Sequence, residues 1–199
     1  MLPPKITIKN IKEARRAFEQ NEPRDLFYRA ARVLVDLSLD RKIKLTLAES
    51  IAVLLQTWNK AYYRFRKFDN EHYCDIEKLF QKHLKSLCNY RKLTIKNLGD
   101  DDEQKIMRIF KDFEIVLGPV GAPKSLHLIA PSIFPLWDRA IAAAYNTPLK
   151  KSGNNAYNYV QFLWATRQQC VWLRKQGKAK DLLKSIDEYN YCKYTKKWI

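Results

Sequence analysis

The sequence predicts an all-α fold, and three observations support this prediction. Apolar residues recur at three- and four-residue spacing along almost the whole chain of 199 residues, and this is the period of an amphipathic helix. Only residues 6–8, Ile-Thr-Ile, alternate in the manner of a strand. The hydrophobic content of 46% supplies side chains for a core and argues against disorder. The length fits one domain, or two small lobes that share a core.

The same spacing places the helices in order, and local signals mark several of their ends. We expect helices over about residues 10–20, 23–39, 47–62, 71–90 and 100–117, two short ones near 122–130 and 135–146, and two more near 155–175 and 179–189. Thr46, with Glu49 three residues later, forms a capping box for the third helix. The acidic run Asp100–Glu103 suits the positive N-terminus of the fifth helix. Gly177 breaks the long helix near residue 175.

The charge balance indicates the kind of partner. The chain carries 37 Lys and Arg residues against 21 Asp and Glu residues, a formal net charge of +16. This excess favours a polyanion, which would be DNA, RNA or an anionic membrane surface, and a solvated lysine-rich surface is the alternative. From residue 115 to residue 180, Asp138 is the one carboxylate among nine basic residues. Such an acid is either a structural cap or ion pair, or a catalytic carboxylate within an anion-binding face.

Several classes of site are excluded by what the sequence lacks. The four cysteines are widely spaced and form no Cys-x-x-Cys pair, so we expect no metal site and no bound cofactor. No glycine-rich phosphate loop is present. No run of about 18 apolar residues predicts a transmembrane helix, and the N-terminus lacks the apolar core of a secretion signal. We expect a cytoplasmic protein with reduced thiols, associated with the nucleoid if the source is prokaryotic.

The segment over residues 116–141, VLGPVGAPKSLHLIAPSIFPLWDRAI, holds the most informative pattern. Gly118 and Gly121 follow the end of a helix and permit a tight hairpin with close approach to a partner. A new helix begins at the next proline, and its free backbone N–H groups, with Lys124 beside them, would form an anion site suited to a phosphate. Prolines then force a second turn, and Asp138 follows at the start of the next helix. The segment thus predicts a device that clamps a nucleic-acid backbone.

This pattern resembles the HhH-GPD (helix-hairpin-helix) superfamily of DNA glycosylases. Members of that superfamily carry a glycine hairpin between two helices, then a proline-rich turn and an aspartate that opens a helix. Here Leu117-Gly-Pro-Val-Gly121 stands for the hairpin, and Phe134-Pro-Leu-Trp-Asp138 stands for the aspartate segment. The specific match covers about 25 residues, and a compatible helical layout extends over about residues 25–175. The Gly-Pro order and the Trp-Asp-Arg context are typical of a divergent branch.

The resemblance implies a two-lobed helical fold with the cleft between the lobes, built by residues 1–199 as a single unit. In this layout residues 25–117 form a helical lobe that includes the Gln56/Trp58 helix, residues 118–146 carry the hairpin and the catalytic segment, and residues 1–24 and 147–199 complete the second lobe. The implied partner is double-stranded DNA with a damaged or modified base. We expect no membrane partner and a monomeric protein.

The resemblance further implies base excision, in which the target nucleotide is flipped out of the duplex into a pocket. Asp138 would stabilise the oxocarbenium character that develops on the sugar, and its structural alternative is to cap the following helix. Lys124 would attack C1′ as an amine and cleave the strand through a Schiff base; its alternatives are a phosphate contact or a solvated charge. We therefore expect a DNA N-glycosylase, with or without AP-lyase activity.

Two sets of contact residues accompany this activity. The DNA-binding set comprises Gly118, Gly121, Lys124, Ser125, Gln56 and Arg139. The base-pocket set comprises Trp58, Asn59, His127 and Trp137, because aromatic side chains stack on extruded bases. Core packing is the alternative for the two tryptophans, and a hydrogen-bonded structural role is the alternative for His127. The run KAYYRFRK over residues 60–67 is either a surface that faces nucleic acid or a helix end with snorkelling cations.

The main alternative function is a non-catalytic, basic helical nucleic-acid-binding protein that uses the hairpin to clamp backbone phosphates. Further alternatives are an enzyme that acts on a modified base in another pathway, and an interaction protein with a basic surface. The environment of Asp138 distinguishes the first two functions. An Asp138 that opens onto a pocket and faces the hairpin favours the enzyme, whereas burial in an ion pair favours the binding protein.

Overall fold

The computed structural model describes residues 3–176 and 181–199, and every regular element in these ranges is helical. The α-helices are α1 (Ile8–Asn21), α2 (Asp25–Leu39), α3 (Leu47–Trp58), α4 (Lys60–Tyr63), α5 (Asn70–Arg91), α6 (Asp100–Ile129), α7 (Arg139–Ala144), α8 (Ala156–Gln176) and α9 (Leu182–Asn190). A 3₁₀ turn, η1 (Ile95–Asn97), and a π-helical turn, η2 (Tyr191–Lys196), are also present. The prediction of an all-α fold is confirmed. None of the described helices is long and apolar enough to cross a bilayer.

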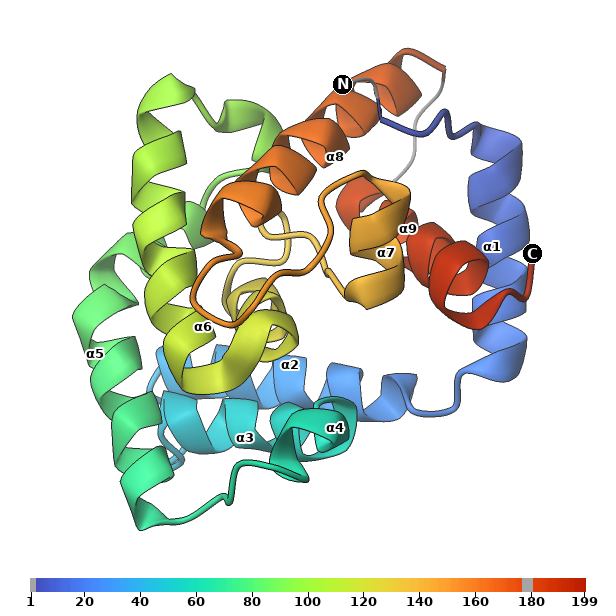
Figure 1. Ribbon diagram of the computed structural model, residues 1–199. Helices are drawn as coiled ribbons and strands as arrows, with labels where there is room; N and C mark the ends of the chain where they lie inside the picture. The colour runs from blue at the N-terminus through green and yellow to red at the C-terminus, as the bar shows by residue number, and fades with distance from the viewer. Residues whose placement is uncertain (1–2, 177–180) are drawn as a thin grey trace.

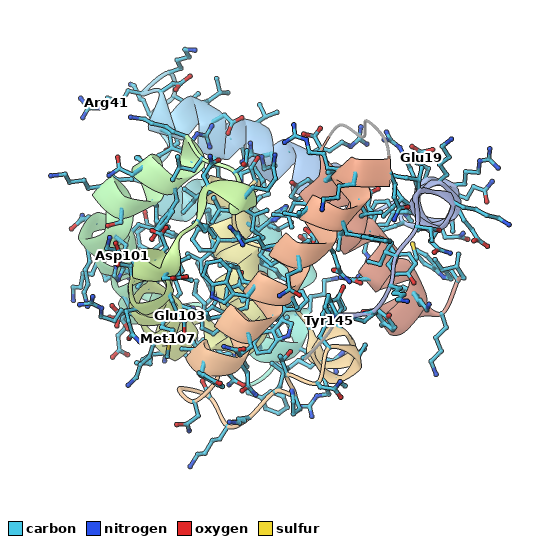
Figure 2. The ribbon with its side chains drawn as sticks, turned by 90° about the horizontal axis from the view of Figure 1, so that it is seen from above. Glu19, Arg41, Asp101, Glu103, Met107 and Tyr145 are labelled. Atoms are coloured by element: carbon cyan, nitrogen blue, oxygen red, sulfur yellow. The ribbon has the colours of Figure 1, made fainter. Side chains whose placement is uncertain are left out.

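The helices form two groups (Figure 1). Helix α8 packs on α9 of one group and contacts α6 of the other, so it joins them. In one group α2 packs on α3, α5 packs on α6, and α6 also contacts α2 and α3. In the other group α1 packs on α9, and the C-terminal turn η2 contacts α1 and α7. Charged side chains such as Glu19, Arg41 and Asp101 extend from the periphery (Figure 2). The two ends of the chain thus meet in one group, while the two-lobed arrangement of the superfamily stays a prediction.

Two helices begin as their local signals predict. The Thr46 hydroxyl accepts a hydrogen bond of 3.2 Å from Glu49 N, and Glu49 Oε2 accepts one of 2.6 Å from Thr46 N. Helix α6 carries four acidic residues in its first turn, and Asp102 Oδ2 accepts a bond of 2.9 Å from Gly99 N. These carboxylates satisfy free N–H groups and complement the positive end of the helix.

Other element bounds differ from the predictions. Residues 6–8 form no strand, because Thr7 is the N-cap of α1 and its side chain accepts a bond of 3.2 Å from Asn10 N. The helix expected over 47–62 is broken at Asn59, where α3 ends and the short α4 follows. Helix α7 is six residues long, shorter than the expected 135–146. Gly177, predicted to break the long helix, lies outside the described residues, as do the basic residues Lys178 and Lys180.

Helix α6 is interrupted at Gly118, where the first predicted helix ends and the hairpin was expected. Helical geometry continues from Asp100 to Ile129 except at Gly118, which has φ 76° and ψ 168°. Residues with a side chain rarely adopt this backbone conformation. Pro119 follows in the first turn of the second segment, where its missing N–H removes no hydrogen bond. The two helices expected on either side of a loop are therefore two segments of α6 that meet at a single residue.

Buried aromatic rings fix the chain between α6 and α7. The rings of Phe110 and Tyr159 stack with their centroids 4.1 Å apart, and Trp137 lies edge-on to Phe110 at 6.0 Å. The Tyr159 hydroxyl donates a hydrogen bond of 3.0 Å to the carbonyl of Pro135. All of these rings are buried. The segment that ends in Asp138 is consequently held against α6 and α8, and the start of α7 has a defined position.

Candidate active site

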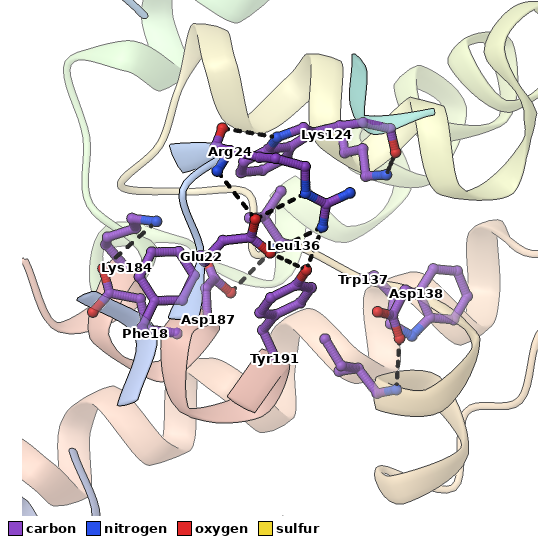
Figure 3. A pocket seen from close by; sticks show the side chains of 13 residues that line it. Phe18, Glu22, Arg24, Lys124, Leu136, Trp137, Asp138, Lys184, Asp187 and Tyr191 are labelled. Atoms are coloured by element: carbon purple, nitrogen blue, oxygen red, sulfur yellow. Dashed lines mark hydrogen bonds and ion pairs between the residues drawn. The ribbon is translucent and has the colours of Figure 1, made fainter. Parts of the chain in front are cut away.

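A pocket lies where the α1–α2 turn, the end of α3, the second segment of α6, the start of α7 and the α9–η2 unit meet (Figure 3). Its volume is about 100 Å³, which is of the same order as the engineered cavity of about 150 Å³ that holds benzene. Four aromatic side chains line it: Phe18, Trp58, Trp137 and Tyr191. Cationic and anionic groups line the rest. Such a pocket suits a planar ring with polar edges.

Lys124 enters this pocket from the second segment of α6 and is half-buried. Its Nζ donates a hydrogen bond to the main-chain carbonyl of Trp58. Burial is the main cause that lowers the pKa of Lys124 to about 8; the charge of Arg24 acts in the same direction and that of Asp138 against it. Near pH 8 about half of the lysine side chains are therefore neutral amines, the form that acts as a nucleophile.

Asp138 is half-buried at the same pocket and is the N-cap of α7. Its Oδ1 accepts a hydrogen bond of 2.9 Å from Ile141 N, and its Oδ2 accepts one of 2.6 Å from the Thr195 hydroxyl. Among the side chains that the structure describes, it has no cationic partner within 4.0 Å. The capping role is thus present, and it is compatible with a chemical role because both hydrogen bonds hold the carboxylate in place.

An ion pair between the buried Glu22 and the exposed Arg24 borders the pocket on the α1–α2 side. Arg24 contacts both oxygens of Glu22, with Nε–Oε1 at 2.8 Å and Nη2–Oε2 at 2.9 Å, and the Tyr191 hydroxyl donates to Glu22 as well (Figure 3). Burial alone would raise the pKa of Glu22, but the hydrogen bonds from Arg24 and Tyr191 outweigh it and hold the pKa at about 2. The carboxylate is therefore ionised throughout the physiological range.

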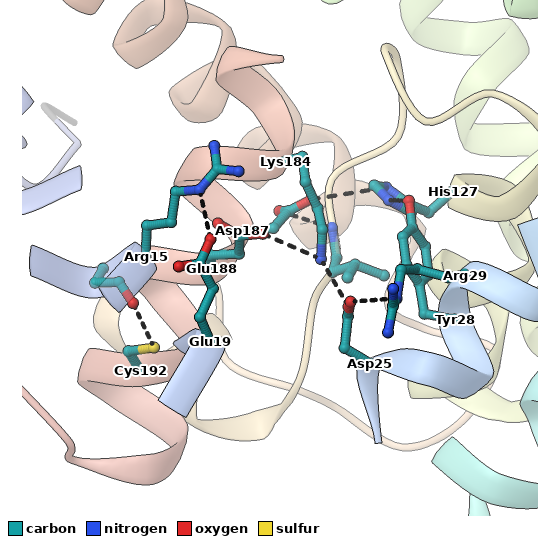
Figure 4. Close-up of polar contacts among 12 residues, drawn as sticks. Arg15, Glu19, Asp25, Tyr28, Arg29, His127, Lys184, Asp187, Glu188 and Cys192 are labelled. Atoms are coloured by element: carbon teal, nitrogen blue, oxygen red, sulfur yellow. Dashed lines mark hydrogen bonds and ion pairs between the residues drawn. The ribbon is translucent and has the colours of Figure 1, made fainter. Parts of the chain in front are cut away.

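Asp187, on α9, contributes a second buried carboxyl group. Its Oδ1 accepts a hydrogen bond of 3.1 Å from Leu136 N. Burial raises the pKa of Asp187 well above its usual range. Its Oδ2 lies 3.7 Å from Nδ1 of His127 (Figure 4). Burial lowers the pKa of His127 to about 3, so the imidazole is neutral at neutral pH and this contact is not an ion pair.

His127, predicted in the base pocket, lies outside its lining. The Nδ1–H of His127 donates to the carbonyl of Phe134 at 2.7 Å, and Nε2 accepts from the Tyr28 hydroxyl at 3.0 Å. We assign this tautomer because a carbonyl oxygen can only accept. With both ring nitrogens hydrogen-bonded and no exposed surface, His127 has the structural role that was its alternative.

The other predicted pocket residues divide between the wall and the packing behind it. Trp58 and Trp137 line the pocket; Trp58 stacks on Tyr28 with centroids 5.6 Å apart. Asn59 is buried away from the lining, and its Nδ2 donates to Leu117 O at 3.3 Å. Gln56 is exposed and does not line the pocket. The segment LLQTWN thus contributes one wall residue, Trp58.

The glycines of the predicted hairpin serve close packing rather than an open backbone surface. Both are buried: a Cβ at Gly118 would lie 2.8 Å from the ring of Tyr62, and a Cβ at Gly121 would lie 2.6 Å from Nδ2 of Asn59. Ser125 is also buried and donates to Gly121 O at 3.1 Å. Of the predicted DNA-binding residues in this segment and α7, Lys124 is half-buried and Arg139 is exposed. The sequence missed the packing because its partners come from α3 and α4.

The structure therefore brings together Lys124, Asp138, Trp58 and Trp137, and it adds groups that no sequence motif marked: Phe18, Glu22, Arg24, Lys184, Asp187, Glu188 and Tyr191. Within residues 3–176 and 181–199, no cluster of three His, Cys, Asp or Glu side chains could hold a metal ion. The arrangement offers a nucleophilic amine and an anchored carboxylate beside aromatic walls. No family model matches the chain, and neither a curated protein nor a solved structure does so.

Proposed function

We propose that the protein is a DNA N-glycosylase that removes a damaged base and then cleaves the strand at the abasic site. The observation that carries this proposal is the convergence of Lys124 and Asp138 on one aromatic pocket. The residues are 14 positions apart and come from different helices. The amine has a pKa of about 8 because of burial, which makes its neutral form available near neutral pH.

The walls of the pocket provide the binding step. A base flipped from a duplex loses its stacking neighbours, and Trp58 and Tyr191 offer aromatic surface that replaces them. The ion pair of Glu22 with Arg24 and the buried carboxyl group of Asp187 supply polar groups along the edge of the ring. The net charge of +16 favours association with the phosphates of the duplex.

The chemical step uses the two convergent residues. The neutral amine of Lys124 forms a bond to C1′ of the sugar while the bond between C1′ and the base breaks. The electron pair of the broken bond leaves with the base, which takes up a proton from water. The carboxylate of Asp138 stabilises the positive charge that develops on the sugar in the transition state. Loss of a proton from the lysine nitrogen and opening of the sugar ring give a Schiff base. Removal of the C2′ proton then expels the 3′-phosphate and cleaves the strand.

Incubation with defined duplexes tests this proposal. The substrates carry uracil, 8-oxoguanine, an alkylated purine or an abasic site, and borohydride is added to trap a Schiff base. We expect excision of at least one lesion and a covalent adduct with wild-type protein. Lys124→Ala should form no adduct, and Lys111→Ala, which removes an exposed lysine of the same helix, should behave as wild type.

Asp138→Asn separates chemistry from folding. Asparagine caps helices as well as aspartate does, so the hydrogen bond from Ile141 N is retained and the fold should be unaffected. Excision should fall by about 100- to 1,000-fold, the usual cost of losing one transition-state contact. Equal excision rates for Asp138→Asn and wild type would remove Asp138 from the mechanism.

The second candidate is a non-catalytic nucleic-acid-binding protein. It is favoured by the hydrogen bonds of Asp138, because both carboxylate oxygens are already occupied by the cap and by Thr195. Tight, salt-sensitive duplex binding without excision or adduct formation on any of the substrates would support this candidate and overturn the glycosylase proposal.

A further inference from the structure

The glycine segment that the sequence predicts as a phosphate clamp has its groups engaged in packing. Gly118, Gly121 and Ser125 are buried, and the Nζ of Lys124 donates a hydrogen bond to the carbonyl of Trp58. A strand whose base enters the pocket must still place its phosphates beside the opening. The cations that contact these phosphates therefore have to come from another element at the edge of the pocket.

The C-terminal turn η2 reaches the pocket through two side chains. Tyr191 lines the pocket, and the Thr195 hydroxyl donates a hydrogen bond of 2.6 Å to Oδ2 of Asp138. These two residues lie four positions apart in a π-helical turn, a form of helix that is frequent at functional sites. The turn also contacts α1 and α7 (Figure 1). Its remaining side chains are consequently placed beside the pocket.

Three lysines of this turn and its end, Lys193, Lys196 and Lys197, are exposed. Among the residues that the structure describes, no carboxylate lies within 4.0 Å of these amines. The amine of Lys184, which lines the same pocket, differs because it lies 3.6 Å from Glu188. The charges on the turn are therefore not neutralised by neighbouring side chains and are available to an anion.

Aromatic rings hold two of these amines in place. The Nζ of Lys196 lies 5.7 Å from the ring centroid of Tyr191 and 5.6 Å from that of Trp198. The Nζ of Lys193 lies 5.2 Å from the ring centroid of Tyr189 and donates a hydrogen bond of 2.7 Å to its hydroxyl. The face of an aromatic ring attracts a cation without neutralising it. Each amine is thus ordered before an anion binds, which lowers the entropy that binding has to offset.

The ring of Tyr191 connects the pocket with these cations. It lines the pocket and also lies under the amine of Lys196. A base held against Tyr191 would therefore have its own sugar–phosphate strand close to Lys196. Arg139, the first residue of α7, is exposed and adds a cation next to Asp138.

We propose that the turn η2 is the phosphate-binding element of the pocket, and that the amines of Lys193 and Lys196 contact phosphates of the strand whose base enters it. An ammonium group is a compact point charge that suits a phosphate oxygen. The inference rests on the DNA partner of the proposed function but not on its chemistry. It gives to the C-terminal turn the role that the sequence predicts for the glycine segment.

Binding to a duplex with a tetrahydrofuran abasic-site analogue, measured over a range of salt concentrations, tests this role without catalysis. Each phosphate contact contributes about 0.9 to the slope of log K against log salt concentration. We expect Lys196→Gln to reduce the slope by about one contact, and Lys193→Gln/Lys196→Gln to reduce it by about two. Lys111→Gln removes the same charge from an exposed position on α6 and should leave the slope unchanged.

Trp198→Leu separates the placement of the amine from its charge. The substitution keeps Lys196 but removes one of the two rings that hold it, so binding should weaken by about 2- to 5-fold with an unchanged salt slope. Lys196→Arg keeps the charge and can stack on the same rings, so it should bind as wild type. Unfolding temperatures measured in parallel show whether each variant is folded, and the two substitutions of Lys196 test the inference even where Trp198→Leu does not fold.

An uncharged linkage locates the contact on the DNA. A methylphosphonate is placed in turn at each phosphate that flanks the analogue. At one position or more it should weaken binding by wild type about 8-fold at 0.1 M salt, the effect of one phosphate contact. The same linkage should have little effect on Lys193→Gln/Lys196→Gln, because the amines that contact the phosphate are absent.

Three results would overturn the inference. The first is an equal salt slope for wild type and Lys193→Gln/Lys196→Gln; if this double variant instead lost binding to vesicles that contain phosphatidylglycerol, the turn would be assigned to a membrane surface. The second is an equal reduction of the slope in Lys196→Gln and Lys111→Gln, which would show that net charge alone acts. The third is absence of duplex binding by wild type.

The inference and the proposed function fail in different measurements. Salt-dependent binding through Lys193 and Lys196 without excision or adduct formation would leave the inference intact and reject only the glycosylase chemistry. Excision by Lys193→Gln/Lys196→Gln with wild-type affinity and salt slope would reject the inference and leave the glycosylase proposal intact.

Discussion

The pKa of the Lys124 amine is set by effects of opposite sign. Burial and Arg24 disfavour the ammonium form, while the carboxylate of Asp138 favours it, and the resulting pKa is about 8. An exposed lysine, by comparison, titrates near 10.4. The difference makes the Lys124 amine distinguishable in solution from an exposed lysine.

Reductive methylation with peptide mapping should therefore show Lys124 reacting with a midpoint near pH 8. Asp138→Asn removes the charge that raises the pKa, so the midpoint should move to lower pH in this variant. Lys111, which is exposed on the same helix, provides the internal control. A midpoint near pH 10 for Lys124 would contradict the effect of burial.

At the scale of the element, α6 depends on one glycine. Gly118 combines a backbone conformation reserved for glycine with contact to Tyr62, whereas Gly153 has φ 89° and open space around it. Comparing substitutions at the two positions therefore separates the cost of backbone strain, which both share, from the cost of steric overlap with Tyr62, which only Gly118 has. Gly153→Ala should lower the free energy of unfolding by about 1 kcal/mol through strain alone.

Gly118→Ala should cost about 2 to 4 kcal/mol in chemical denaturation, because the new Cβ would also overlap the ring of Tyr62. When Gly118→Ala is introduced into the Tyr62→Ala variant, it should lower the free energy of unfolding by less than it does in the wild-type protein, because the Tyr62 ring that the new Cβ would overlap is absent. Equal losses of unfolding free energy in Gly118→Ala and Gly153→Ala would show that the contact with Tyr62 adds nothing to the cost of a side chain at residue 118.

The elements also show which features a sequence can predict. Thr46 with Glu49, and the acidic start of α6, depend on residues within four positions, and both predictions are confirmed. The helix end at Leu117 was predicted, whereas the break at Asn59 and the close contact of Gly118 with Tyr62 depend on the packing of α3, α4 and α6. Tyr191 comes from a π-helical turn that no periodicity predicts. The sequence therefore predicted four residues of the pocket, namely Lys124, Asp138, Trp58 and Trp137, but not the side chains from α1, α9 and the C-terminal turn that complete it.

At the scale of the molecule, Glu22 connects the two ends of the chain. It is bonded to Arg24 and to Tyr191, which lies 169 positions away, and it is buried. Its folded-state pKa of about 2 lies below the ordinary value of 4.5. This group therefore contributes stability that is fully present above about pH 4.5 and is lost as the pH falls towards 2.

Glu22→Gln should accordingly lower the free energy of unfolding by about 1 to 2 kcal/mol at pH 7, because solvent around the exposed Arg24 screens the ion pair. The difference from wild type should shrink between pH 4.5 and pH 2 in urea titrations. Glu19→Gln removes the exposed ion pair with Arg15, a type of contact worth about 0.5 kcal/mol. A Glu22→Gln deficit that did not change with pH would show that the carboxylate charge is not its source.

The pocket also has an order of assembly during synthesis. Phe18 and Glu22 are made before Lys124 and Asp138, and Tyr191 and Thr195 are made after them. A nascent chain that has already produced its reactive lysine still lacks the residues that close the pocket around it. The site can therefore form only after the C-terminal turn has been translated, and a prematurely terminated product would carry the lysine without the enclosure.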